Sequence, residues 1–286
     1  MMNLREVKQR ILSVKSTQKI TSAMKLVSSA KLRRAQAAIE SMRPYETRLN
    51  GMLETFFGSD VTLGGEYTAV RKVERVALIA VASDSSLCGA FNANMSRLLR
   101  IVLDEYRAQG INVKLYTVGR KMLEAARKME IDPEQALMSQ SSSPRYNEVS
   151  AVASFLMDEF RNGMLDKVEI LYTRFASASK HIPTRDCLLP VAVEDTSTEI
   201  IHSDFIVEPG KEELVNSLLP KSIALKLFTA LLDSVAAEHA ARMMAMQIAT
   251  DNADDLIAEL TLEYNKGRQQ TITNELLDIV AGSNKE

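Results

Sequence analysis

The sequence predicts a Rossmann-like α/β domain inserted between two long helices that pack against each other as an antiparallel coiled coil. Both ends of the 286-residue chain are poor in helix-breaking residues and place apolar side chains at alternating steps of three and four. The middle alternates short β-branched runs with helical segments. The predicted division is residues 1–60 for the first helix, 70–208 for the α/β domain and 209–286 for the last helix.

The first segment has no Gly before Gly51 and a single Pro, Pro44, which should kink the helix or end a turn because it lacks an N–H donor. Its coiled-coil seam begins with Leu4, Val7, Ile11 and Val14, and the same rhythm returns as Ala35, Ala38, Met42, Tyr45, Leu49, Met52 and Phe56.

The last segment opens with Pro209-Gly210 and Pro220 and then contains no Pro to Glu286. Its seam is Leu225, Phe228, Leu232 and Val235, and later Met246, Ala249, Ala253, Leu256 and Leu260. His239 and Arg242 interrupt this seam, and polar seam positions commonly set register.

The charges of the two ends are complementary. Residues 1–57 carry eleven Lys or Arg against four Glu, whereas residues 209–286 carry seven Lys or Arg against twelve Asp or Glu. An antiparallel register in which facing residue numbers add up to about 266 would pair opposite charges. It places Lys15 opposite Asp251, Lys8 near Glu259, Arg33 opposite Asp233 and Met24 opposite Arg242, and leaves Lys266 to Glu286 without a partner helix.

The middle segment predicts a small parallel sheet with right-handed crossovers. The expected strands are residues 76–81, 113–118 and 168–172, with a further edge strand at 188–193. The expected helices are 92–109, 120–129 and 147–162, with a Ser-rich loop at 139–145 and a linker at 196–209.

Several classes of protein are disfavoured by composition. The chain has no secretory-type leader and no uninterrupted apolar run of membrane-spanning length. Cys88 and Cys187 lie far apart, and there are only three His, so neither a disulfide framework nor a zinc site is predicted. A reducing compartment fits this cysteine usage best.

The loop from Ser83 to Ala90 follows a predicted strand and precedes a helix, which is where a nucleotide phosphate would bind. It has one Gly, and the phosphate-loop pattern is absent from the chain, so a structural turn capped by Asp84 or Ser85 is favoured. We identify no catalytic residues and no cofactor or metal site. Two alternatives remain on the residues alone: the basic first helix as an RNA-binding arm, and the middle segment as a small Rossmann-type enzyme.

Three segments resemble the gamma subunit of F-type ATP synthase. They are residues 18–27 with 30–36, the loop motifs Ser83-Asp84, Leu87-Cys88-Gly89 and Phe91-Asn92, and a C-terminal run from Glu238 through Glu275-Leu276. The chain departs from the family pattern at Ser85-Ser86, where Arg-Gly is usual, and at Ala90, where Gly is common. The resemblance covers essentially the whole chain and is weakest at residues 190–210.

The resemblance implies a non-catalytic rotor whose terminal helices form a left-handed antiparallel coiled coil. This shaft would turn inside a ring of three alpha and three beta subunits, with the α/β domain beside the epsilon subunit and the membrane c-ring. No cofactor and no nucleic acid are implied, and the expected location is the cytoplasmic face of a bacterial plasma membrane, held there through the complex.

Family analogy also implies inter-subunit contact residues. They are Met24 and Lys25 on the first helix, and Arg242, Lys266, Arg268, Gln269, Thr273 and Glu275 on the last. The tip from Leu276 to Val280 would sit in an apolar bearing of the ring.

Overall fold

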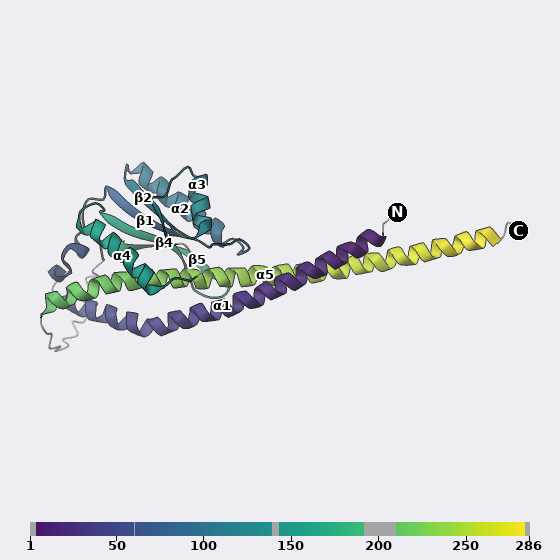
Figure 1. Ribbon diagram of the computed structural model, residues 1–286, viewed down its shortest axis with the longest axis horizontal. Helices are drawn as coiled ribbons and strands as arrows, with labels where there is room; N and C mark the ends of the chain where they lie inside the picture. The colour runs from purple at the N-terminus through teal and green to yellow at the C-terminus, as the bar shows by residue number, and fades with distance from the viewer. Residues whose placement is uncertain (1–3, 60, 139–142, 192–209, 284–286) are drawn as a thin grey trace. The chain divides into compact units, whose positions relative to one another are not determined.

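The computed structural model describes residues 4–59, 61–138, 143–191 and 210–283 (Figure 1). The chain forms two compact units: residues 30–241, and residues 1–29 together with 242–286. Two helices, α1 (Leu4–Ser59) and α5 (Lys211–Ser283), run through both units. We describe each unit separately, as the unit of residues 30–241 and the terminal unit.

The unit of residues 30–241 contains one five-stranded sheet in the order β3-β2-β1-β4-β5. The first four strands in this order are parallel, and β5 is antiparallel to β4. The strands are β1 (Arg75–Val81), β2 (Asn112–Val118), β3 (Gln135–Met138), β4 (Lys167–Phe175) and β5 (His181–Leu189). The helices between them are α2 (Phe91–Ala108), α3 (Arg120–Lys128) and α4 (Tyr146–Arg161). The predicted α/β class is confirmed.

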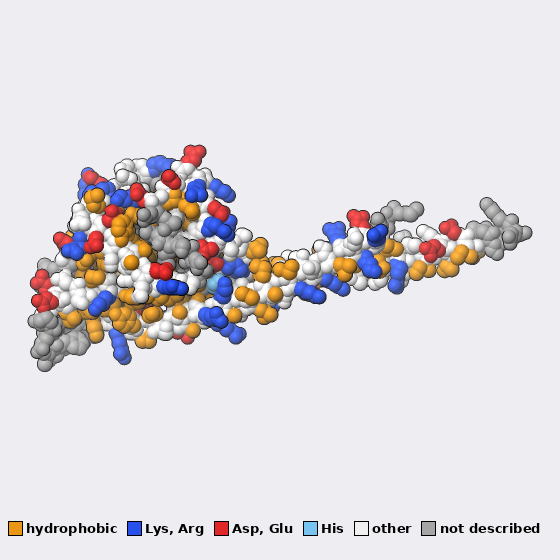
Figure 2. Space-filling model, viewed as in Figure 1, with side chains coloured by type: hydrophobic (Ala, Val, Ile, Leu, Met, Phe, Trp, Pro, Cys, Tyr) orange, Lys and Arg blue, Asp and Glu red, His pale blue; other side chains and the backbone are white. Residues whose placement is uncertain are grey.

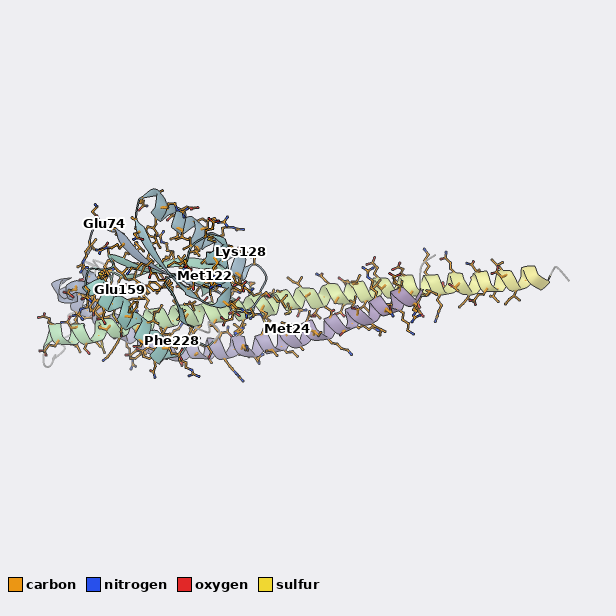
Figure 3. The ribbon with its side chains drawn as sticks, turned by 45° about the horizontal axis from the view of Figure 1, so that its top comes forward. Met24, Glu74, Met122, Lys128, Glu159 and Phe228 are labelled. Atoms are coloured by element: carbon orange, nitrogen blue, oxygen red, sulfur yellow. The ribbon has the colours of Figure 1, made fainter. Side chains whose placement is uncertain are left out.

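Strand β1 lies at the centre of this unit because its residues from Val76 to Val81 are buried on both faces of the sheet. Helices α2 and α3 cover one face, where Met122 and Leu99 pack. Helices α4 and α5 cover the other, where Phe228 and Phe160 pack (Figure 3). The sheet is thus fixed directly to α5.

The edge of the sheet differs from the prediction. The strand expected at residues 188–193 is β5, which ends at Leu189 and forms an antiparallel hairpin with β4. Strand β3 and a short 3-10 helix at Val61–Thr68 were not predicted. Residues 139–142 of the expected Ser-rich loop and the whole expected linker lie outside the described residues.

Helix α1 continues through Pro44 as one element, so of the two predicted effects of this proline, a kink or a break, the break does not occur. The apolar seam shifts beyond this point: Tyr45 and Met52 are exposed, whereas Leu53 and Phe57 are buried. Phe57 and its neighbours pack against Val215 and Leu219 of α5. Before Pro44, Ala38, Ile39 and Met42 pack on the core that includes Phe228 of α5, so apolar contacts hold the helix on both sides of the missing backbone hydrogen bond.

In the terminal unit, α1 and α5 are antiparallel and bury Val7, Met246, Ala253 and Leu260. Three hydrogen bonds between the two helices define their register: Gln18 Nε2 to Asp254 Oδ1 at 2.7 Å, Thr21 Oγ1 to Thr250 Oγ1 at 2.8 Å, and Lys25 Nζ to Gln247 Oε1 at 2.8 Å.

The register predicted from charge is wrong, because the bonded residue numbers add up to 271 or 272 rather than about 266. Asp251 accepts a hydrogen bond from Gln247 of its own helix instead of facing Lys15, and the same offset separates Lys8 from Glu259 and Met24 from Arg242. In the unit of residues 30–241, the charged neighbours of Asp233 are Glu46, Arg43 and Arg174, and Arg33 is not among them. Exposed ion pairs are too weak to outweigh the fit of buried side chains.

Within the described residues, α5 is the one helix whose length and composition would allow it to cross a membrane. Half of its apolar stretch is buried inside the protein. A core helix satisfies the same criterion, and the contacts of α5 with the sheet and with α1 bury part of its apolar side chains.

Candidate functional site

The end of α5 forms an exposed surface that α1 does not cover. In the observed register, Leu4 at the start of α1 lies level with residue 268 or nearby, and every residue from Thr271 to Val280 is exposed. Five of these residues are large and apolar: Ile272, Leu276, Leu277, Ile279 and Val280. Their orange side chains lie along the free end of α5 in Figure 2. Exposed apolar side chains gathered in one short stretch are typical of a site that a partner protein covers.

The predicted contact residues near this end are also exposed. Within the described part of the chain, the side chains of Lys266, Arg268, Gln269 and Glu275 form no hydrogen bond or ion pair. The Thr273 hydroxyl donates to the backbone oxygen of Gln269 at 2.9 Å. These five residues are therefore accessible to a partner.

The three other predicted contact residues lie in the paired part of the terminal unit. Lys25 is bonded to Gln247, Arg242 is buried, and Met24, labelled in Figure 3, is half-buried. The structure thus divides the eight predicted residues into an accessible group at the end of α5 and a group inside the helix pair.

Sequence reasoning missed a second apolar surface in the terminal unit. Its members are exposed on the two paired helices: Leu12, Ile20, Leu26, Val27, Met244 and Ile248. The signal that could have found them is that these residues fall outside the seam, where a helix exposed to solvent would carry polar side chains.

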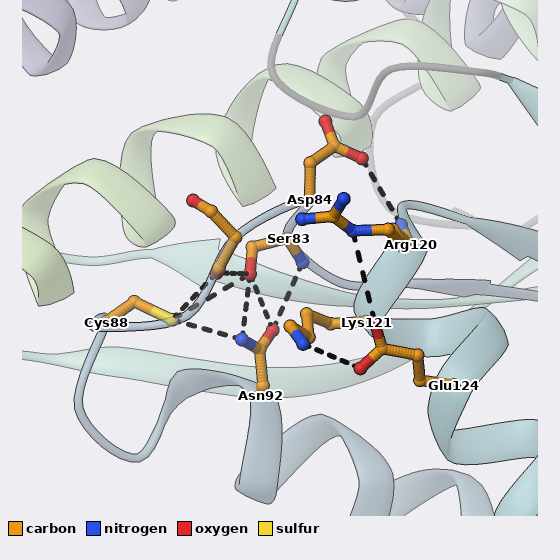
Figure 4. Close-up of polar contacts among 8 residues, drawn as sticks. Ser83, Asp84, Cys88, Asn92, Arg120, Lys121 and Glu124 are labelled. Atoms are coloured by element: carbon orange, nitrogen blue, oxygen red, sulfur yellow. Dashed lines mark hydrogen bonds and ion pairs between the residues drawn. The ribbon is translucent and has the colours of Figure 1, made fainter.

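The loop after β1 is closed by its own hydrogen bonds (Figure 4). Ser83 N donates to Asn92 Oδ1 at 3.1 Å, and Asn92 Nδ2 donates to Ser83 Oγ at 2.8 Å. Arg120 N donates to Asp84 Oδ1 at 3.2 Å, so Asp84 caps the start of α3. These groups stabilise a turn. No cluster of metal-binding side chains occurs among the residues searched, which are those the structure describes.

A buried ionic network fixes β5 to the rest of the α/β domain. Glu169 on β4 is 2% exposed and accepts hydrogen bonds from Arg185 Nε at 2.7 Å and from Tyr106 Oη at 2.8 Å, while Lys167 Nζ lies 2.6 Å from its other oxygen. Burial alone would raise the pKa of Glu169, but the bonds from Arg185, Lys167 and Tyr106 outweigh it and hold the pKa below its ordinary value. The ionised carboxylate is the form that the fold requires.

A second carboxylate is disfavoured in its ionised form. Burial and the neighbouring Glu46 carboxylate raise the pKa of Asp233 to about 6, against the opposing influence of Arg43 and Arg174. Because this pKa exceeds the unfolded value of 3.8, the proton stabilises the fold at low pH, and this stabilisation is lost as the pH rises through about 6.

Asp233→Asn is therefore expected to raise the melting temperature of the full chain at pH 8, where the wild-type carboxylate is charged. The difference from wild type should shrink as the pH falls from 7 to 4, as followed by thermal unfolding at each pH. Asp104→Asn, at an exposed position, is the control and should change little. An equal effect of Asp233→Asn at both ends of this range would contradict the assignment.

Comparisons with known proteins match this chain to one family over nearly its full length. A family model described as ATP synthase matches residues 3–284. The chain is 50% identical over 287 residues to the ATP synthase gamma chain of Phocaeicola vulgatus, with 99% of each chain covered. It is 47% identical over 296 residues to the ATP synthase gamma chain of Bacteroides thetaiotaomicron, again with 99% of each covered.

Solved structures share the fold. A chain in the OSCP/F1/c-ring structure of Euglena gracilis mitochondrial ATP synthase, in rotational state 3, matches with a TM-score of 0.65 and 20% identity over 98% of this chain and 93% of that chain. A chain in the central stalk/c-ring structure of the Tetrahymena thermophila mitochondrial ATP synthase matches with a TM-score of 0.59 and 24% identity over 80% of this chain and 99% of that chain. Together with the matches to the full length of bacterial relatives, these likenesses confirm the resemblance inferred from the motifs, and the chain belongs to the ATP synthase gamma chain family.

Proposed function

We propose that the chain is the central-stalk rotor subunit of a bacterial F-type ATP synthase. It couples ion-driven rotation of the membrane ring to ATP synthesis or hydrolysis at the catalytic beta subunits. The observation that carries this proposal is the 50% identity, over 99% of both chains, to a bacterial ATP synthase gamma chain. The partners are three alpha and three beta subunits, the epsilon subunit and the c-ring.

The chain acts through contacts rather than chemistry. An asymmetric helix pair cannot touch three identical catalytic subunits in the same way, so each rotational position favours a different conformation of each site. A difference of about 1.4 kcal/mol in contact free energy changes the ratio between two conformations of a catalytic site tenfold. The closed loop after β1 supports a role without nucleotide binding by this chain.

The exposed end of α5 is the proposed contact surface within the ring. Lys266, Arg268, Gln269, Thr273 and Glu275 supply polar contacts, and the apolar residues from Leu276 to Val280 turn in an apolar bearing. Met24, Lys25 and Arg242 contribute from the paired part of the same unit. Their burial supports a smaller direct contact than that of the α5 end.

As part of a membrane-bound complex, the chain sits at the cytoplasmic face of the bacterial inner membrane and is held there by its partners. The identity with gamma chains of bacteria supports this location. The packing of half of the apolar stretch of α5 inside the protein supports attachment through protein rather than through lipid.

We expect the purified chain to hydrolyse no ATP, and an affinity-tagged copy expressed in its own cells to co-purify with alpha and beta subunits as an active ATPase. Depleting the chain should abolish ATP-driven ion pumping in inverted membrane vesicles, and re-expressing it should restore pumping. ATP turnover that stayed with the isolated polypeptide, or vesicles that pumped normally without it, would overturn the proposal.

A further inference from the structure

Hydrogen bonds between polar side chains join α1 to α5 at three successive seam positions of the terminal unit. The bonded pairs are Gln18 with Asp254, Thr21 with Thr250, and Lys25 with Gln247. Their positions step by three and four along both helices, which is the spacing of a coiled-coil seam. We call these six residues the polar seam.

The central pair of the polar seam is buried. Thr21 and Thr250 are each 8% exposed, and their hydroxyl oxygens lie 2.8 Å apart. Each hydroxyl oxygen also lies within hydrogen-bond distance of a backbone oxygen of its own helix, Thr21 of Gln18 at 3.0 Å and Thr250 of Met246 at 2.8 Å. Because each hydroxyl carries one proton, one of the two donates to the other across the helices, and the other donates to its own backbone. Both side chains are therefore held in fixed rotamers that meet in a single alignment of the helices.

In one of the outer pairs, a bond within α5 also orients the side chain. Gln247 donates from Nε2 to Asp251 Oδ1 at 2.6 Å, and this bond turns its Oε1 toward Lys25 Nζ. The Gln18 amide reaches Asp254 at 2.7 Å. All three contacts are directional, and hydrogen bonds weaken steeply when their distance or angle changes.

The remaining seam of this unit cannot specify alignment as sharply. On α1 it consists of Val7, Ile11 and Val14, and it continues on α5 through Leu256 and Leu260. Apolar packing is non-directional, and a heptad seam repeats every seven residues, so packing alone also accommodates an alignment displaced by one heptad.

We propose that the polar seam fixes the axial register of α1 against α5, and that Gln18, Thr21 and Lys25 with their partners are positioning residues of the helix pair. Lys25 thus serves mainly inside the pair, although family analogy assigns it to inter-subunit contact. The residues on both sides of the seam belong to the two motifs that resemble the family signature, which gives those motifs a role within the chain itself.

The test compares two cysteine pairs in the purified full chain, so its result does not depend on the proposed rotor function. Ile11→Cys with Leu260→Cys reports the observed register, and Ile11→Cys with Ala253→Cys reports a register displaced by seven residues. A disulfide forms only where the two Cα atoms come within about 7 Å. Variants with one introduced cysteine give the background that arises from Cys88 and Cys187.

Each cysteine pair is introduced into two backgrounds, the wild-type chain and a variant in which all six residues of the polar seam are apolar. The substitutions in this variant are Gln18→Leu, Thr21→Val, Lys25→Leu, Gln247→Leu, Thr250→Val and Asp254→Leu. The wild-type chain should cross-link only the observed pair. In the chain with the apolar seam, cross-linking of the displaced pair should rise about tenfold or more above wild type. Each hydrogen bond lost from the observed register changes the ratio of displaced to observed register by a factor of about five. The melting temperature should stay equal or rise, since both partners of each bond are replaced by apolar groups.

Thr17→Val with Thr261→Val is the matched control, because these threonines also bond to their own helices but are exposed outside the seam. This control should behave like wild type. If the six-residue variant does not fold, Thr21→Val with Thr250→Val alone decides the question. Cross-linking of the displaced pair in wild type, or its absence from the folded apolar variant, would overturn the proposal.

Discussion

Replacing Glu169 by Ala is expected to lower the free energy of unfolding of the full chain by about 3–5 kcal/mol, because it leaves two cations without their shared carboxylate. Arg185 and Lys167 both pair with Glu169, and Tyr106 donates a further hydrogen bond to it. The network joins α2, β4 and β5, so its loss should release the edge of the sheet. Urea unfolding followed by circular dichroism measures the change.

Glu105→Ala is the matched control, since Glu105 pairs with the same Arg185 at 2.7 Å but its side chain is about half exposed. That variant should lose less than about 1 kcal/mol. Because the folded pKa of Glu169 lies below the unfolded value of 4.5, its contribution is present above that pH and is lost as the pH falls through the folded pKa. The gap between wild type and Glu169→Ala should therefore narrow only in acid. Equal losses in the two variants would show that burial of Glu169 adds nothing.

Much of the fold follows from periodicity. The strand at residues 76–81 and its neighbours were predicted because apolar β-branched runs bounded by turn residues have few other interpretations. Strand β5 was misplaced because its sequence from His181 to Leu189 includes Pro183 and three basic or acidic residues, which do not alternate with apolar ones as in a buried strand. Its position depends on the buried network around Glu169, which no local pattern reveals.

The register of the helix pair could not be read from charge. Lys15 and Asp251 suggested an alignment, but both are exposed, and such pairs are worth well under about 1 kcal/mol. The observed alignment instead places the hydroxyls of Thr21 and Thr250 together in the seam. Threonine occurs on many helix surfaces, so its sequence position alone does not distinguish a buried pair from an exposed one. The free end of α5 was predicted to begin at Lys266, but in the observed register Leu4 of α1 lies level with residue 268, so the part of α5 beyond α1 begins later than predicted.

The exposed polar residues Lys266, Arg268 and Gln269 at the end of α5 are expected to contribute to assembly and turnover of the complex, but not to the stability of the isolated chain. Replacing Lys266, Arg268 and Gln269 together by Ala should leave the melting temperature of the isolated chain unchanged, because these exposed side chains make no hydrogen bond or ion pair within the described residues. Each charge-assisted bond lost to a surrounding subunit would cost about 1.5–3 kcal/mol. Reconstituted complexes should therefore assemble less well or turn over more slowly, measured as ATP hydrolysis and ion-driven ATP synthesis.

The α/β domain supplies a control of the same composition. Lys128, Arg127 and Gln109 are exposed at the ends of α3 and α2, and replacing these three by Ala removes the same side-chain types away from the helix end. If contact with the ring is specific to the end of α5, the first triple variant loses activity and this one does not.

Wild-type assembly and turnover of the Lys266, Arg268 and Gln269 variant would instead place the polar contacts elsewhere on the helix pair. The exposed apolar residues of the terminal unit, Ile20, Leu26 and Ile248 among them, would then be the surface to substitute next, because they too lie outside the packed seam.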